Sequence, residues 1–182
     1  MQLRNVVLIM TASIDGYVAA PTGQAVGQLP EPADLKRWKL ERIRRAGTHI
    51  MGRVTYEGMA TVWPTSKDDY AAPMNEIPKV VFSKSLKEAK WPESKIARGP
   101  LADEVAALRS QPGGEIIAWG GAGFAQSLAR AGLLDEYAII TQPLAYGGGK
   151  PLFHELPDAL QFEVLATTVY ASGTTLRLYK PR

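Results

Sequence analysis

The 182-residue sequence contains no cysteine, which excludes disulfide bonds, a thiolate nucleophile and a cysteine-ligated zinc site. It also lacks an apolar run near the roughly 18 residues that a membrane-spanning helix requires. Its first apolar run, Val6 to Met10, is shorter than the core of a signal peptide, which usually has about 7–15 apolar residues. We therefore expect a cytoplasmic protein with no membrane partner.

The sequence also has few histidines and little excess of one charge over the other. The 2 histidines, His49 and His154, have no second ligand at a metal-binding spacing, so no metal site is expected. The 21 lysines and arginines barely exceed the 18 aspartates and glutamates. The basic residues within 33–46 surround an apolar stripe, as on a solvated helix, so no nucleic-acid partner is expected. The sequence has no G-x-S-x-G turn, the motif that would indicate a hydrolase.

What the sequence does contain is a regular alternation of apolar and amphipathic segments. The periodicity predicts strands at residues 3–12, 48–52, 79–83, 115–119 and 136–142. It predicts helices at residues 33–46, 54–61, 101–110 and 123–131. The polar, proline-interrupted segment 66–78 is expected to be a surface loop. Residues 162–170 and 174–180 flank a turn and are expected to form a β-hairpin.

This order of elements predicts a single α/β domain over residues 1–182. The alternation favours a mixed, mostly parallel sheet with helices on both faces, and the C-terminal hairpin adds an antiparallel edge. Sheets of this kind bind ligands at the carboxyl ends of their strands. The residues that follow each predicted strand are therefore the candidate site.

A cluster of glycines follows the strand at 115–119. Gly120, Gly121 and Gly123 precede a helix whose first N–H groups favour an anion. The cluster fails as a dinucleotide fingerprint, because Gln126 occupies the position of the third small residue. Two interpretations remain from the glycines alone: a turn for close helix–sheet packing, or a place where a ligand approaches the backbone.

Two other strand ends favour the ligand. Gly52, Arg53 and Thr55 lie where a strand becomes a helix. The glycine lets a ligand approach the backbone, and the arginine and threonine supply a guanidinium and a hydroxyl that can bind phosphate. Ser83 and Lys84 offer a hydroxyl and a cation after the next strand. Three strand ends suited to phosphate indicate one shared anionic ligand.

Four segments in this order resemble the dihydrofolate-reductase-like proteins. They are TASIDG at 11–16, IMGRVTYEG at 50–58, VVFSKS at 80–85, and the segment from AWGGAGF to GGGKPLF at 118–153. The chain is most similar to the branch that contains the reductase domain of the bacterial riboflavin-biosynthesis deaminase–reductase. The resemblance implies a three-layer α/β/α fold and an oxidoreductase that uses NADPH.

The resemblance also implies roles for individual residues. Arg53 and Lys84 would hold the 2′-phosphate of NADPH, and Thr55 with Ser83 would support its phosphates next to Gly52. The pyrophosphate and nicotinamide would lie over Gly120, Gly121, Ala122, Gly123 and Phe124. Thr11 and Ala12 would contact the nicotinamide carboxamide, with Gly16 beside them.

The reaction also needs a proton donor, because reduction of a C=N bond adds a proton as well as a hydride. The catalytic candidates are Asp34 first and Asp15 second. We expect Asp34 to be buried beside Trp38, which would raise the pKa of its carboxyl. Two other interpretations stay open, since Asp34 also suits a helix N-terminus and Asp15 also suits a turn. Trp38 and Tyr56 could stack on a flat substrate or belong to the core.

The expected substrate is a small nitrogen heterocycle, either a pyrimidine like 5-amino-6-ribosylaminouracil phosphate or a pterin like dihydrofolate. The riboflavin branch usually carries an Asp-x-Pro-x-Leu-x-x-Arg segment after the second strand, whereas this chain has EGMATVWPTSKDDY at 57–70. That departure leaves an alternative, an NADPH-binding module or sensor that has lost catalysis. The resemblance further implies a homodimer that pairs through the C-terminal strands.

Overall fold

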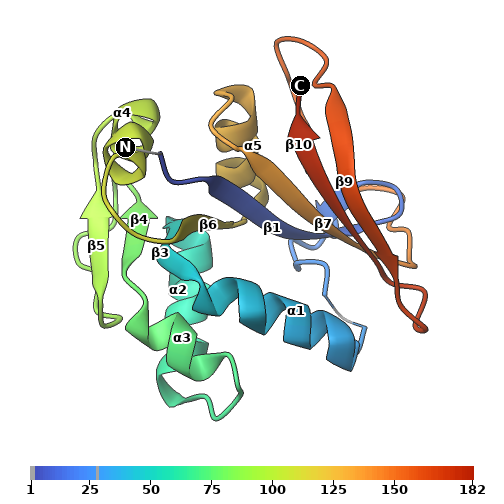
Figure 1. Cartoon of the computed structure of the whole chain (residues 1–182), viewed down its shortest axis with the longest axis horizontal. Helices are drawn as coiled ribbons and strands as arrows, with labels where there is room; N and C mark the ends of the chain where they lie inside the picture. The colour runs from blue at the N-terminus through green and yellow to red at the C-terminus, as the bar shows by residue number, and fades with distance from the viewer. Residues whose placement is uncertain (1–2, 28) are drawn as a thin grey trace.

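The computed structural model of the chain describes residues 3–27 and 29–182. Its main sheet has the strand order β5-β4-β3-β6-β1-β7-β10-β9 (Figure 1). The strands are β1 Val6–Ser13, β3 Ala46–Gly52, β4 Lys79–Phe82, β5 Ser94–Ala97, β6 Glu115–Trp119, β7 Glu136–Gln142, β9 Phe162–Val169 and β10 Thr175–Pro181. A small second sheet pairs β2, Tyr17–Ala19, with β8, Lys150–Pro151.

The strand pairing confirms the predicted fold class. Every pair from β5 across to β7 is parallel, whereas β10 pairs antiparallel with both β7 and β9. The helices are α1 Ala33–Arg44, α2 Arg53–Val62, α3 Ala71–Glu76, α4 Leu101–Arg109 and α5 Ala122–Arg130, with a 3-10 turn η1 at Trp63–Thr65.

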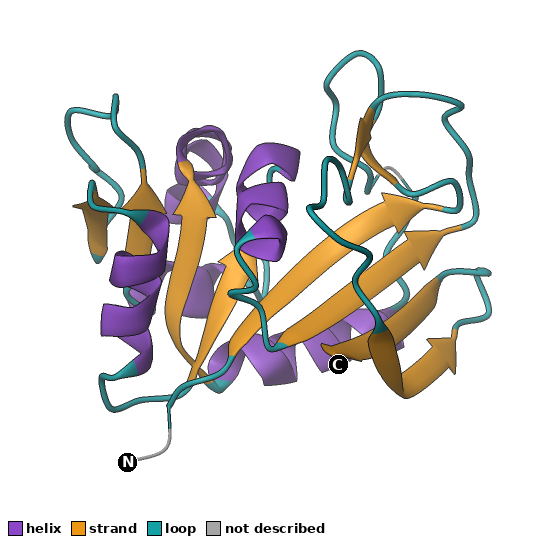
Figure 2. Cartoon of the chain, turned by 90° about the horizontal axis from the view of Figure 1, so that it is seen from above, coloured by secondary structure: helices purple, strands orange, loops and turns teal. Residues whose placement is uncertain are grey.

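Two hydrophobic cores cover the two faces of the sheet. In β1, Val6 and Leu8 belong to the core under α4 and α5, whereas Val7 and Ile9 belong to the core under α1, α2 and α3. Successive side chains of a strand point to opposite faces, so a strand with helices on both sides is apolar at every position. This is why β1 appears in the sequence as an uninterrupted apolar run. Figure 2 shows the helices on both sides of the sheet.

The prediction for residues 66–78 was wrong in part, because the segment contains helix α3. Met74 on this helix is fully buried. The ammonium of Lys79, which is also buried, donates hydrogen bonds to the carbonyl oxygens of Met74, Asn75 and Ile77 at 2.8–3.0 Å. A cation at the end of a helix satisfies carbonyl groups that have no partner within the helix. The anchor of α3 is therefore a tertiary contact that local sequence does not display.

Arg42 joins α1 to the amino ends of two strands. Its guanidinium donates to both carboxylate oxygens of Glu115 on β6, at 2.7 and 2.9 Å, and to Glu136 on β7 at 2.8 Å. Arg42 is buried, whereas both glutamates keep partial contact with solvent. Charge-assisted bidentate pairs of this kind are strong and directional. Arg42 therefore fixes α1 across the amino edge of the sheet.

Arg42→Ala is expected to lower the free energy of unfolding by about 2–3 kcal/mol, because it leaves two partly buried carboxylates without their cation. Arg37→Ala is the matched control on the same helix. Arg37 forms an exposed ion pair with Asp34, so its loss should change stability by no more than about 0.5 kcal/mol. Urea unfolding of both variants measures the difference. Equal effects would contradict the role given to Arg42.

Candidate active site

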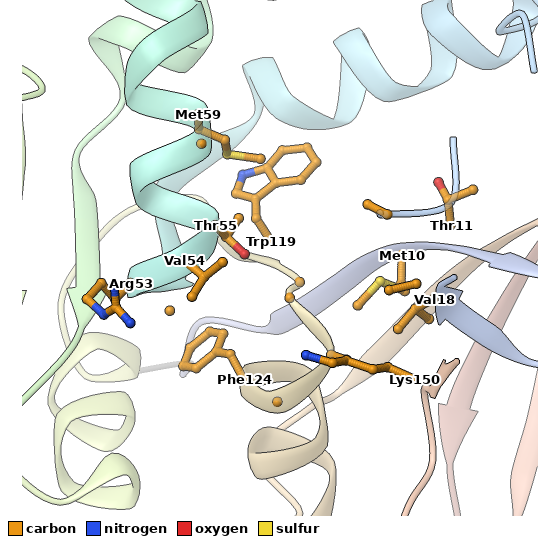
Figure 3. A pocket seen from close by; sticks show the side chains of 18 of the residues that line it. Met10, Thr11, Val18, Arg53, Val54, Thr55, Met59, Trp119, Phe124 and Lys150 are labelled. Carbon is orange, nitrogen blue, oxygen red and sulfur yellow. The ribbon is translucent and has the colours of Figure 1, made fainter. Parts of the chain in front are cut away.

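A pocket of about 900 Å³ opens at the carboxyl ends of β4, β3, β6 and β1. Its wall contains ten of the residues expected from the sequence: Thr11, Gly52, Arg53, Thr55, Ser83, Gly120, Gly121, Ala122, Gly123 and Phe124. Figure 3 shows the side chains of Thr11 on β1, Arg53 and Thr55 in the first turn of α2, and Phe124 near the start of α5. The structure therefore brings residues from three strand ends, all suited to binding phosphate, into one pocket.

Gly120 and Gly121 pass through a space that leaves little room for side chains. A Cβ atom on Gly120 would overlap the end of the Met10 side chain, and one on Gly121 would lie 3.0 Å from Thr55 Oγ1. Met10 is buried on β1, and Thr55 lies in the first turn of α2. The cluster is thus both a tight passage between β1 and α2 and part of the pocket wall.

Two helices begin at the pocket without a side-chain cap. The N-cap residue of α2 is Gly52 and that of α5 is Gly121, and a glycine supplies no side-chain oxygen. The first N–H groups of a helix have no partner within the helix, and together with the helix dipole they attract anions. Gly52 also lies close to the start of α5, since a Cβ there would be 3.2 Å from Phe124 Cβ. Two anion-attracting helix starts are therefore side by side.

All charged side chains among the described residues that line this pocket are cations: Lys39, Arg53 and Lys150. Arg53 forms an ion pair with Glu57 one helical turn away at 2.8 Å, and both side chains are about half exposed. Ser83 lies near the same end, where its hydroxyl accepts a hydrogen bond from the N–H of Leu86 at 2.9 Å. The pocket therefore has a positive lining at more than one place.

Lys150 reaches the pocket because of the glycine-rich segment before it. Gly149 has a φ of +125°, and a Cβ there would overlap the carbonyl of Ala19 on β2. The N–H of Leu152 donates to the carbonyl of Gly16 at 3.1 Å, and Gln126 on α5 donates to the carbonyl of Pro151 at 2.8 Å. These contacts direct Lys150 toward Phe124 (Figure 3). The sequence analysis gave Lys150 no role in the site.

Trp119 forms another part of the wall that sequence reasoning missed. Its indole Nε1–H donates to Nδ1 of His49 at 3.0 Å, and it lies beside Met59 (Figure 3). His49 is fully buried on β3, and burial lowers its pKa to about 4. The imidazole therefore remains neutral at physiological pH and keeps Nδ1 as an acceptor. The position of Trp119, directly before the glycine cluster, was the available signal in the sequence.

Asp34 does not occupy the buried position that we expected. Its side chain is 71% exposed, forms an ion pair with Arg37 at 3.0 Å, and is not among the described lining residues. The helix begins at Ala33, and in that phase residue 34 faces solvent. The expected burial beside Trp38 was wrong.

Asp15 lies in the turn after β1 and binds the segment before β8. Its carboxylate accepts hydrogen bonds from the hydroxyl of Ser13 and from the N–H groups of Tyr146 and Gly147. The Ser13 hydrogen bond is the largest cause that lowers the pKa of Asp15, followed by that of Gly147. A carboxyl with a lowered pKa is a poor proton donor at neutral pH. The contacts of Asp15 instead hold two loops together.

The remaining expected residues lie outside the described lining of the pocket. Trp38 and Tyr56 pack in the core on the α1 face, and the buried hydroxyl of Tyr56 accepts a hydrogen bond from the N–H of Trp91 at 2.9 Å. Ala12 is buried in β1, Gly16 forms the turn after β1 with a φ of +85°, and Lys84 is exposed. The structure therefore groups Trp38 and Tyr56 with the core.

Residues 3–27 and 29–182 contain no group of three or more histidine, aspartate or glutamate side chains that could hold a metal ion. Across the same residues, every helix is too short or too polar to cross a membrane.

The sequence and fold match known proteins. Residues 4–176 match the family model of the RibD C-terminal domain. The chain is 22% identical to "Uncharacterized protein YyaP" of Bacillus subtilis (strain 168), over 98% of this chain and 96% of that protein.

Solved structures with low identity share the fold. The "Putative riboflavin biosynthesis protein" of Shewanella sp. PV-4 is 24% identical, with a TM-score of 0.81 over 98% of this chain and 99% of that one. The dihydrofolate reductase of Enterococcus faecalis, complexed with NADP(H) and RAB-propyl, is 19% identical, with a TM-score of 0.66 over 98% and 96%. Because the family model spans nearly the whole chain, the protein belongs to the RibD C-terminal domain family.

Proposed function

We propose that the protein is an NADPH-dependent reductase of a small nitrogen heterocycle. The observation that carries the proposal is a pocket of about 900 Å³ with two uncapped helix N-termini and an exclusively cationic set of charged lining residues. That volume lies at the upper end of the roughly 300–1,000 Å³ of small-molecule sites, as a dinucleotide together with a substrate requires.

The residues at the pocket fit an NADPH molecule. Arg53 and Ser83 would hold the adenosine end, and the starts of α2 and α5 would bind the pyrophosphate with their N–H groups. The side-chain-free passage at Gly120 and Gly121 would let the cofactor approach the backbone, with the nicotinamide next to Thr11. Lys84 lies outside the described lining, so we assign the 2′-phosphate chiefly to Arg53. NADPH supplies a hydride when bound.

The substrate class follows from the family and from the shape of the site. The RibD C-terminal domain and a fold shared with a riboflavin biosynthesis protein and a dihydrofolate reductase support a pyrimidine or pterin ring. Trp119 would give such a ring a flat apolar contact, because its polar N–H is already bound to His49 behind the pocket wall.

The proton would come from water. Among the described residues that line the large pocket, none carries a carboxyl group, and Asp34 and Asp15 have the solvent-exposed and loop-binding positions described above. A bound water can deliver a proton to a heterocycle nitrogen as the hydride adds. The task of the protein is then to align the two rings at the roughly 3–3.5 Å that a near-attack geometry requires.

The protein is expected to bind NADPH more tightly than NADH, because Arg53 can form charge-assisted hydrogen bonds with the 2′-phosphate. Arg53→Ala should cost on the order of 1.5–3 kcal/mol in NADPH affinity and leave NADH affinity nearly unchanged. Lys84→Ala is the comparison variant and should lose much less. Titration of the nicotinamide fluorescence measures the affinity of each of the three proteins for both cofactors. Equal affinity of the wild type for both cofactors would contradict the assignment of Arg53 to the 2′-phosphate.

Catalysis is tested by an NADPH-oxidation screen over dihydrofolate, other pterins, and aminouracil ribityl or ribosyl phosphates. We expect at least one of these compounds to be reduced, with product identified by mass spectrometry. Binding of NADPH without oxidation by any of them would favour the alternative, an NADPH-binding sensor that has lost catalysis.

The exposed edge strand β9 supports the expected homodimer. Val164, Leu165 and Val169 are 56%, 47% and 69% exposed, and an apolar edge strand invites pairing with another chain. Val169→Lys should shift the protein toward a monomer of 19.8 kDa, because it places a charge in the paired edge. Light scattering at micromolar concentration measures the mass. A monomeric wild type would refute the dimer.

A further inference from the structure

The three cations that line the large pocket differ in what neutralises them. Arg53 is paired with Glu57 at 2.8 Å, and Lys39 is paired with Glu31 at 2.5 Å. Glu31 lines a smaller cavity of about 60 Å³ that adjoins the large pocket. In the part of the chain that the structure describes, the ammonium group of Lys150 has neither an ion pair nor a hydrogen bond. Lys150 is therefore the lining cation whose charge remains available to a ligand.

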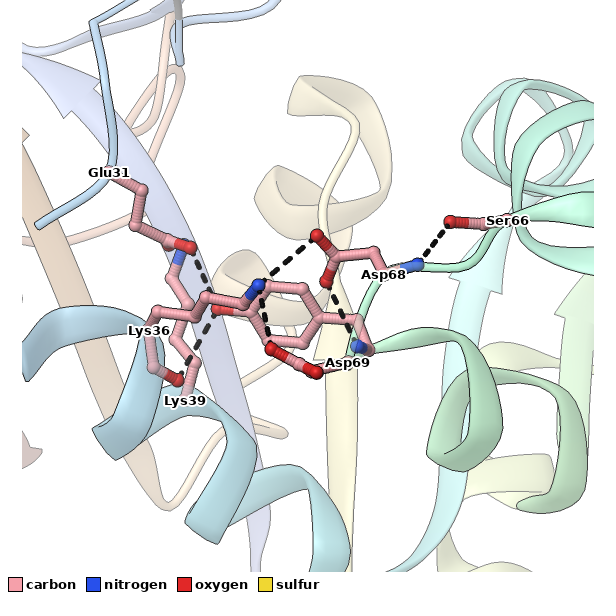
Figure 4. A network of polar contacts seen from close by, with 7 residues as sticks. Glu31, Lys36, Lys39, Ser66, Asp68 and Asp69 are labelled. Atoms are coloured by element: carbon pink, nitrogen blue, oxygen red, sulfur yellow. Dashed lines mark hydrogen bonds and ion pairs between the residues drawn. The ribbon is translucent and has the colours of Figure 1, made fainter. Parts of the chain in front are cut away.

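The pairing of Lys39 is fixed by its surroundings (Figure 4). The hydroxyl of Tyr70 donates to the second carboxylate oxygen of Glu31 at 2.9 Å. On the same helix as Lys39, Lys36 binds Asp68 at 3.2 Å, which ties the segment that carries Tyr70 to α1. Glu31 is thus held from two elements, so its carboxylate stays beside Lys39.

The position of Lys150 depends on contacts between two segments, the one after β1 and the one after β7. The carboxylate of Asp15 accepts hydrogen bonds from the N–H of Tyr146 at 3.1 Å and from the N–H of Gly147 at 2.7 Å. Further along the chain, Lys150 lies opposite Ala19 in the small sheet of β2 and β8. Asp15 and β2 therefore hold the segment of the lysine at two places.

Asp15 matters because the segment between these two contacts has no side chains of its own. Residues 147–149 are all glycine, and Gly147 and Gly149 have φ values of +66° and +125°. Glycine restricts the backbone less than any other residue, so such a run keeps one conformation only where contacts from outside fix it. The carboxylate of Asp15 is such a contact, and it holds the start of the run that leads to Lys150.

We propose that Lys150 binds the pyrophosphate of the bound dinucleotide, and that Asp15 is the positioning residue that holds Lys150 in place for this contact. The inference rests on the proposed function, which places the pyrophosphate at the starts of α2 and α5. Lys150 adds a cation from β8 to that place, since its side chain is directed toward Phe124 near the start of α5 (Figure 3). An ammonium group with no partner of its own gains a charge-assisted hydrogen bond there and breaks none.

This role makes Lys150 indifferent to the kind of cofactor. The pyrophosphate is common to NADPH and NADH, whereas the 2′-phosphate assigned to Arg53 is present in NADPH alone. Loss of Lys150 should therefore weaken the binding of both cofactors by the same factor. Asp15 is not among the described residues that line the pocket, so its effect on affinity should pass through the lysine and disappear when the lysine is absent.

Lys150→Met and Asp15→Asn, alone and combined, test the proposal, and Lys150→Arg, which keeps the cation, tests for rescue. Lys95→Met on β5 and Asp103→Asn on α4 are the matched control variants, because they make the same changes of charge at exposed positions outside the described pocket lining. Titration of the nicotinamide fluorescence gives the affinity of each protein for NADPH and for NADH, and thermal unfolding gives its Tm.

We expect Lys150→Met to weaken NADPH and NADH binding equally, by about 5- to 30-fold, in the range of one charge-assisted hydrogen bond at a partly exposed site. Asp15→Asn should weaken both by a smaller common factor in the wild-type background and by none in the Lys150→Met background, because residues that act through one another are not additive. Lys150→Arg should recover most of the affinity, and the control variants should bind like the wild type. A merely structural role of Asp15 predicts instead a lower Tm with equal losses of affinity in both backgrounds.

Unchanged cofactor affinity in Lys150→Met, or a loss confined to NADPH, would overturn the inference while the reductase proposal stands. A raised KM for a phosphorylated substrate alone would overturn it too, because it would assign the lysine to a phosphate of the substrate. Equal losses from Asp15→Asn in both backgrounds would refute the positioning role of Asp15.

Inorganic pyrophosphate, followed by ³¹P NMR, separates this inference from the proposed function. We expect the wild type to bind pyrophosphate and Lys150→Met to bind it more weakly. If this pattern is found and neither cofactor binds, the proposed function fails and Lys150 remains a pyrophosphate ligand. If neither pyrophosphate nor a cofactor binds to the wild type, both proposals fail.

Discussion

The candidate site depends on one steric constraint, the contact between Gly120 and Met10. Strand β6 lies between β3 and β1, so the chain that leaves β6 must pass between the ends of both neighbours. A side chain at Gly120 would overlap Met10, and one at Gly121 would crowd Thr55. Gly121 is the N-cap of α5, so this helix starts directly after the passage, close to the start of α2. The positive ends of two helices therefore meet at one pocket.

Helix α1 connects the two edges of the sheet. Near its C-terminal end, Arg42 binds Glu115 and Glu136 at the amino edge, where the helix cannot slide without breaking three hydrogen bonds. One turn earlier in the helix, Lys39 lines the large pocket at the carboxyl edge and binds Glu31. The ion pairs of Arg42 thus hold in place the helix that presents Lys39 to the pocket.

The parts of the fold that the sequence predicted are those determined by local pattern. The strands of the sheet centre are buried on both faces and so appear as apolar runs, and the glycines at their ends lie close to the side chains of Phe124, Met10 and Thr55. Helix α3 was not predicted because it is held by the buried Lys79, and the sequence does not show whether a lysine is buried or exposed.

The site was predicted better in its glycines than in its charged side chains. A carboxylate near the start of α1 was expected to face the substrate, and the helix phase turns Asp34 to solvent while Glu31, before the helix, lines the smaller cavity. The places of Lys150 and Trp119 in the pocket wall were not predicted for a related reason. Their directions follow from contacts with β2 and with His49, which lie far away in the sequence.

The backbone contact between Gly149 and β2 has a consequence for how the pocket can vary among relatives. Lys150 is directed into the pocket by main-chain atoms, because Gly149 packs on the carbonyl of Ala19 in a left-handed conformation that other residues rarely adopt. The position of the lysine therefore depends on the residue before it and not on the identity of the side chains of β2. Replacement of Gly149 would displace the charge from the pocket even though Lys150 itself is kept.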